Sequence, residues 1–134
     1  MKIINIIFVI IYCIIIDYPN IAMLSAKMYQ DNFKKITKED FKIKWIPAAL
    51  AYITMSISIN YFILNKFNNS SPTKDILMTA SILGFCIYGV YNFTNQATLN
   101  NYSTQVTIKD TIWGSTLYPL VSYLMIKVYP KIQS

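Results

Sequence analysis

The stretch ILMTASILGFCIYGVYNFTNQATL, residues 76–99, decides the fold class of this 134-residue chain. It carries no charged residue, and at a rise of about 1.5 Å per residue a helix of this length crosses a hydrocarbon core about 30 Å thick. Three other segments share its length and apolar character: residues 3–24, 45–64 and 111–128. The sequence therefore predicts an all-α polytopic membrane protein, a bundle of four transmembrane helices that forms one domain over residues 1–134.

The composition favours the same fold class. Hydrophobic residues make up 54% of the chain and charged residues 13%, whereas soluble domains carry about 25% charged residues. A chain this apolar is not expected to be disordered or to fold as an ordinary soluble domain. Isoleucine, asparagine and lysine are abundant and arginine is absent, a bias typical of translation from an AT-rich genome.

The positive charge is concentrated between the first two predicted helices. The net charge is +6, and six lysines lie in this loop: Lys27, Lys34, Lys35, Lys38, Lys42 and Lys44. Lysine at this density beside a membrane helix indicates topology and contact with anionic lipid rather than nucleic-acid binding. The positive-inside rule then places residues 25–44 in the cytoplasm. We expect four side chains to contact lipid headgroups: Lys34, Lys35, Lys38 and Lys42.

The lysine-rich loop also has a helical pattern. Met28, Tyr29, Phe33 and other apolar residues recur at helical spacing among the lysines, which favours a helix lying in the headgroup region over a solvated linker. Thr37 followed by Asp40 fits a capping box. This motif predicts that a new helix begins there.

A polar stripe runs along the segment 76–99. Tyr88, Asn92 and Asn95 fall on one helical face, with Thr98 at its edge. Such a stripe cannot face lipid cheaply, so it is expected to point into the bundle. Asp17, late in the first predicted helix, must also point inward, either protonated or held by tyrosine hydroxyls and asparagine amides.

Two readings of these polar residues stay open. In the first, interhelical hydrogen bonds simply hold membrane helices together. In the second, an intramembrane carboxylate marks a proton or solute pathway. Near the fourth predicted helix, Thr107 with Asp110 fits another capping box, and Trp113 suits the interfacial aromatic belt. The candidate polar pocket comprises these eight residues: Asp17, Tyr52, Tyr88, Asn92, Asn95, Thr98, Asp110 and Trp113.

The motif Y-x-x-Y-N-x-T-N-x-A-T-L from Tyr88 to Leu99, followed by V-T-x-x-D-x-x-W-G from Val106 to Gly114, resembles a known family. It is similar to small predicted membrane proteins of bacteria and giant viruses, grouped as domain of unknown function 2177. An acidic residue late in the first helix, a tyrosine soon after it and a Pro-Ala pair complete the resemblance at Asp17, Tyr29 and Pro47.

The resemblance implies a four-helix membrane protein with a polar centre, of bacterial or giant-virus origin, and brings no established activity. One departure concerns Asn92, where the family usually has aspartate. A proton-carrying role at this position would be lost, although the amide can still form hydrogen bonds.

Three classes of function remain. The first is an integral membrane protein that binds or transports a solute, a proton or a lipid through the polar pocket, either alone or as a homo-oligomer. The alternative is a structural or assembly protein of a cellular or viral membrane. A lipid-acting enzyme is the weakest reading, because the chain has no histidine and no serine set beside a base. We expect no catalytic residues, cofactor or metal site, since Cys13 and Cys86 have no ligand partner nearby in sequence.

Overall fold

The computed structural model describes residues 2–128, and these residues form helices and connecting loops without a β-strand. The α-helices are α1 (Ile3–Pro19), α2 (Ala26–Thr37), α3 (Trp45–Ile59), α4 (Thr73–Thr98) and α5 (Thr104–Tyr123). Each of α1, α3 and α5 continues into a π-helical segment: η1 (Asn20–Leu24), η2 (Asn60–Leu64) and η3 (Leu124–Val128). The all-α fold class is therefore confirmed.

Three of the helical stretches are long and apolar enough to cross a membrane: Ile3–Leu24, Trp45–Leu64 and Thr73–Thr98. The first two have the predicted bounds, and the third begins three residues earlier than expected. Pro47 lies in the first turn of α3, where its missing N–H has no intrahelical partner to lose. The helix predicted over residues 111–128 begins instead at Thr104 and does not meet the same criteria of length and composition.

The capping motif at Thr37 and Asp40 does not start a helix, so that prediction was wrong. Thr37 is instead the last residue of α2, and its hydroxyl donates to the Phe33 carbonyl one turn earlier. Lys38 follows with a left-handed backbone (φ 62°) that ends the helix. The segment from Glu39 to Lys44 is not helical.

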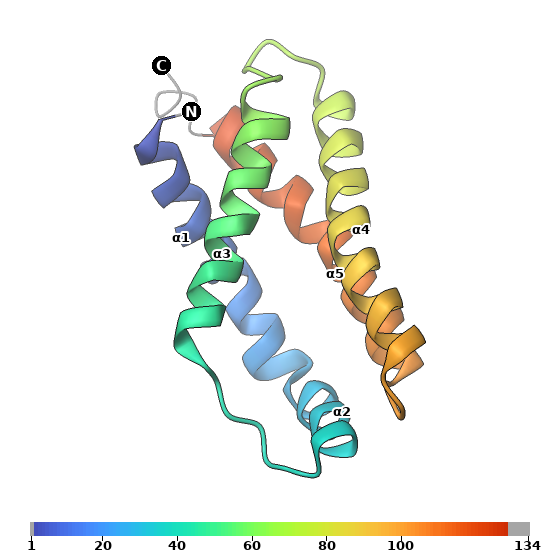
Figure 1. Cartoon of the computed structure of the whole chain (residues 1–134). Coiled ribbons are helices and arrows are strands. Elements are labelled where there is room, and N and C mark those ends of the chain that lie inside the picture. The colour runs from blue at the N-terminus through green and yellow to red at the C-terminus, as the bar shows by residue number, and fades with distance from the viewer. Residues whose placement is uncertain (1, 129–134) are drawn as a thin grey trace.

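α5 is the best buried helix of the bundle. Leu117, Tyr118, Val121 and Met125 of α5 and η3 are fully buried and join the hydrophobic core. α4 packs along α5, and α1 packs on both α3 and α5. Figure 1 shows α4 and α5 side by side and α2 at one end of the bundle. The pair α4 and α5 thus faces the pair α1 and α3, with α2 closing one end.

The close approach of α4 and α5 depends on glycine. A Cβ atom added at Gly84 would collide with the backbone carbonyl of Gly114, and one added at Gly114 would collide with the Tyr88 side chain. Small residues permit such backbone contact between membrane helices. Gly84 and Gly114 therefore set the position of Tyr88 and the rest of α4 relative to α5.

Hydrogen bonds hold α5 and η3 at both ends of the bundle. At the α2 end, the Ser103 N–H donates to Asn32 Oδ1 of α2 at 2.8 Å. At the opposite end, Lys127 Nζ donates to the carbonyls of Asn69 and Ser71 in the loop between η2 and α4, at 2.6 and 2.7 Å. The rod formed by α5 and η3 therefore extends between the two ends of the bundle.

Candidate functional site

Asp17 joins three helices through its carboxylate. It lies in the last turn of α1 and is 4% exposed. Tyr52 Oη of α3 donates to Asp17 Oδ2 at 2.8 Å, and Trp113 Nε1 of α5 donates to Asp17 Oδ1 at 2.7 Å. Each oxygen of the Asp17 carboxyl group therefore accepts a hydrogen bond from one uncharged donor.

Asp110 makes an equivalent junction one helical turn before Trp113 on α5. Tyr29 Oη of α2 donates to Asp110 Oδ1 at 2.7 Å, and Asn92 Nδ2 of α4 donates to Asp110 Oδ2 at 2.6 Å. Asn92 is fully buried; its amide also donates to the Tyr88 carbonyl, and its Oδ1 accepts from Tyr102 Oη at 2.8 Å. Between them, Asp17 and Asp110 connect all five α-helices.

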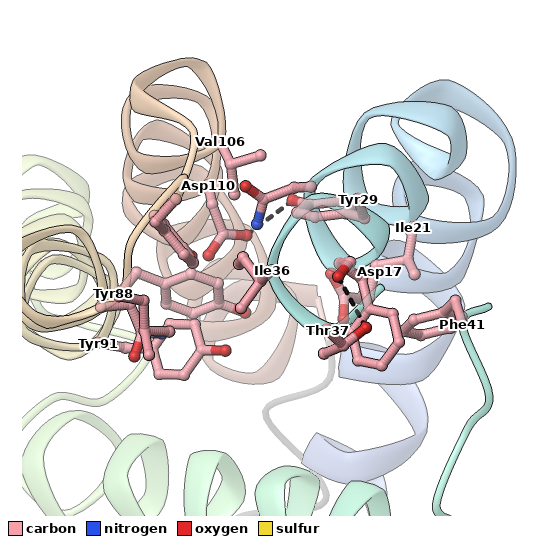
Figure 2. A pocket seen from close by; sticks show the side chains of 15 residues that line it. Asp17, Ile21, Tyr29, Ile36, Thr37, Phe41, Tyr88, Tyr91, Val106 and Asp110 are labelled. Carbon is pink, nitrogen blue, oxygen red and sulfur yellow. Dashed lines mark hydrogen bonds between the residues drawn. The ribbon is translucent and has the colours of Figure 1, made fainter. Parts of the chain in front are cut away.

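Both carboxylates line one cavity of about 480 Å³ near the α2 end of the bundle. Figure 2 shows side chains from α1 and α2 facing side chains from α4 and α5 across it. Its wall combines apolar and tyrosine side chains with a few polar groups, and the lining residues are these: Asp17, Ile21, Tyr29, Asn32, Phe33, Ile36, Thr37, Phe41, Tyr88, Tyr91, Asn95, Leu99, Tyr102, Val106 and Asp110. Its volume lies within the range of about 300–1,000 Å³ that is typical of small-molecule pockets.

The model of a protein family described as predicted membrane protein (DUF2177) matches residues 2–126. The chain belongs to this family. No curated protein and no solved structure gives a significant match. The DUF2177 description and the three candidate spans agree on a membrane-embedded protein of unknown function.

Most of the candidate pocket residues in this DUF2177 chain lie at or beside the cavity. Four of them line it: Asp17, Tyr88, Asn95 and Asp110. Three do not line the cavity but donate hydrogen bonds to its carboxylates: Tyr52, Asn92 and Trp113. Thr98 lies elsewhere: it is exposed, and its hydroxyl donates to the Thr94 carbonyl of its own helix.

Asp110 and Trp113 have a different structural setting from the one expected. They lie inside α5 rather than at the start of a helix, because Ser103 is the N-cap residue. The Trp113 indole N–H donates to the buried Asp17 carboxylate.

Two contributors were absent from the sequence-based set, Tyr29 and Tyr102. Tyr29 had appeared only as an apolar position of the lysine-rich loop and as a point of family resemblance, and Tyr102 lies in the short connection between α4 and α5. Their positions on a loop helix and in a connection gave no periodic signal. Packing of α2 against α5 brings the Tyr29 hydroxyl to Asp110, 81 residues away in sequence.

Both of these hydroxyls are poor acids. Burial raises the pKa of Tyr29, and the neighbouring Asp110 carboxylate raises it further. Burial also raises the pKa of Tyr102, although its hydrogen bond with Asn95 opposes part of the shift. Both tyrosines therefore act as neutral hydrogen-bond donors at physiological pH.

The cavity presents carboxylates, hydroxyls and amides beside apolar and aromatic side chains. Within residues 2–128, no group of three or more His, Cys, Asp or Glu side chains is placed to hold a metal ion. Ordered carboxylates, hydroxyls and amides can orient a polar headgroup, and the apolar wall can accommodate a hydrocarbon portion.

The lysines expected at lipid headgroups lie on the outside of the α2 end. Lys34, Lys35, Lys38 and Lys42 are all exposed. Lys34 Nζ pairs with Asp40 at 3.0 Å, and Lys38 Nζ donates to the Lys35 carbonyl. These side chains are accessible, and none of them lines the cavity.

Proposed function

We propose that this protein binds a small amphiphilic molecule in the cavity between α2 and the pair α4 and α5. The observation that carries the proposal is the cavity itself, about 480 Å³ in volume, with two carboxylates among largely apolar and aromatic side chains. A site of this kind holds the polar end of a ligand at the carboxylates and its hydrocarbon along the wall.

The location of the cavity supports a membrane-derived ligand. α2 forms one wall through Phe33, Ile36 and Thr37, and the loop after it contributes Phe41. α2 is amphipathic, with apolar side chains in the cavity and lysines exposed on its outer face. Such a helix lies in the headgroup region of a bilayer. A ligand dissolved in the membrane would meet the cavity at this depth.

The test is occupancy of the cavity. Ile36→Trp adds an indole where Figure 2 shows Ile36 between the two walls, so the larger ring is expected to exclude the ligand. Ile82→Trp is the matched control, because Ile82 is 57% exposed on α4 and does not line the cavity. Native mass spectrometry of the detergent-purified protein should detect a retained amphiphile in the wild type and in Ile82→Trp, and none in Ile36→Trp.

Two outcomes would contradict binding. A wild-type protein without a retained molecule would shift the interpretation to a structural protein whose polar network fastens helices. Equal retention in Ile36→Trp and Ile82→Trp would place the bound molecule on the lipid-facing surface.

We further propose that α5 and η3 form a fourth span and that α2 lies at the cytoplasmic face. The support comes from hydrogen bonds at the two ends of this helical stretch. Ser103 is bonded to α2, and Lys127 is bonded to the loop between η2 and α4. The low hydropathy of α5 follows in part from its central position, because Thr107, Thr111 and Ser122 are buried among the other helices. Lys109 and Thr116 of the same helix are exposed. Four spans place residue 2 and Val128 on the same side of the membrane.

Single-cysteine labelling tests this topology. In a background with alanine at the two native free cysteines, cysteine is introduced at Lys38, Ser70, Asn100 or Val128, all of which are exposed. A membrane-impermeant maleimide applied to oriented vesicles should label Lys38→Cys and Asn100→Cys from one side, and Ser70→Cys and Val128→Cys from the other. Labelling of Val128→Cys together with Asn100→Cys would show that α5 does not cross.

A further inference from the structure

In the part of the chain that the structure describes, the two carboxylates of the cavity have no positively charged partner. There, Asp17 and Asp110 accept hydrogen bonds from uncharged groups: two tyrosine hydroxyls, one indole and one amide. No lysine is among the 15 lining residues, and within residues 2–128 neither carboxylate forms an ion pair. Each carboxylate oxygen still has acceptor capacity, since one hydrogen bond uses only part of it.

Aromatic side chains share the cavity wall with these carboxylates. Six aromatic side chains line the cavity: Tyr29, Phe33, Phe41, Tyr88, Tyr91 and Tyr102. The faces of aromatic rings attract ammonium groups, and aromatic cages with acidic residues recognise amines and quaternary ammonium ions. The aromatic wall is a second feature beside the acidic residues, to which Tyr29 is hydrogen-bonded, and both features favour a cation.

We infer that the amphiphile bound in this cavity is a cation, with a protonated or quaternary amine near Asp17 and Asp110 and a hydrocarbon tail along the apolar wall. This inference rests on the proposed binding function and adds the charge of the ligand. An amine would supply the positive charge that the protein does not provide at the carboxylates.

The distribution of lysine argues against an anionic ligand inside the cavity. Lys34, Lys35 and Lys38 are exposed on or just after α2, where they can hold anionic headgroups at the surface. Inside, an anion would meet two carboxylates without a compensating base, which is unfavourable at low dielectric. The protein thus separates an outer surface suited to anions from an inner site suited to cations.

The experiment compares three probes that differ in the charge of the headgroup and have alkyl chains of similar length: decyltrimethylammonium, decanoate and decanol. The protein is placed in nanodiscs of zwitterionic lipid, and Trp113 fluorescence reports binding in a Trp45→Phe background, because Trp113 contacts Asp17 and the chain has two tryptophans. The cation is expected to bind at least about tenfold more tightly than the other two probes.

The matched variants remove the charge without removing the hydrogen bonds. In Asp17→Asn, the amide carbonyl can accept from Trp113 while its N–H₂ donates to the Tyr52 oxygen; Asp110→Asn can do the same with Asn92 and Tyr29. The double variant should lose the preference for the cation, by about tenfold or more. Asp75→Asn, an exposed carboxylate outside the cavity, changes net charge in the same direction and should retain the preference.

Each other outcome overturns the inference. Equal binding of all three probes, with the retained amphiphile still lost from Ile36→Trp in native mass spectrometry, would leave the binding function intact and remove the charge assignment. A cation preference that persists in the double variant would show that the carboxylates do not create it. Binding of none of the probes, with no retained molecule in the wild type, would reject both the charge assignment and the binding function.

Discussion

Replacing Gly84 with alanine is expected to destabilise the protein by about 3 kcal/mol, the upper range for forcing extra volume into a packed interior. The added Cβ would overlap the backbone carbonyl of Gly114, and a backbone atom cannot move aside as a flexible side chain can. α4 and α5 would have to separate along their contact. Thermal unfolding in detergent, followed by size-exclusion chromatography of the soluble fraction, measures the effect as a large fall in Tm.

Gly89→Ala is the matched control on the same helix. A Cβ there would lie 3.3 Å from the Phe93 ring and 3.8 Å from Thr111 Cγ2, so a small side-chain adjustment is sufficient. Because alanine favours helix more than glycine by about 1 kcal/mol, this variant should be neutral or slightly stabilised. Equal losses in Gly84→Ala and Gly89→Ala would show that the contact between Gly84 and Gly114 does not determine the packing.

Asp17→Ala should produce the second large effect, a loss of about 2 kcal/mol of stability. Truncation leaves the Tyr52 hydroxyl and the Trp113 N–H, both half-buried, without the acceptor that joined α1, α3 and α5. Unpaired donors at membrane depth are costly because no water replaces the lost partner. Denaturant titration monitored by Trp113 fluorescence should show earlier unfolding and an altered emission in the folded state.

Asp17→Asn separates hydrogen bonding from charge in the same measurement. The amide retains an acceptor for Trp113 and a donor for Tyr52, so its stability should stay within about 1 kcal/mol of the wild type. If Asp17→Ala were as stable as Asp17→Asn, the carboxylate would contribute little to holding the three helices, and its place in the cavity would need another explanation.

Much of the fold could be predicted because lipid imposes simple rules on sequence. The bounds of Ile3–Leu24 and Trp45–Leu64 follow from length and hydropathy alone. The inward position of Asp17 and Asn92 follows from the cost of exposing them to hydrocarbon, and both are buried in the structure. For such residues, burial among the other helices avoids the free-energy cost of exposing polar groups to hydrocarbon.

What could not be predicted depends on tertiary contacts. The start of α5 was placed too late because the residues after Ser103 are polar, and their helical conformation is stabilised by packing on α4 and α2. The capping motif at Thr37 matches the composition of a helix start, yet the hydroxyl bonds backward to Phe33. Tyr29 belongs to the site because its hydroxyl donates to Asp110, which lies 81 residues later in the sequence. No local sequence pattern encodes such a contact.

The hydrogen bonds of Asp17 also constrain the order of events during synthesis. Asp17 enters the membrane with the first helix, whereas Trp113 is 96 residues later in the chain and Tyr52 is 35 residues later. Until α5 has been synthesised, Asp17 Oδ1 lacks the hydrogen bond from Trp113. The cavity can therefore close only after the chain has been synthesised past Trp113.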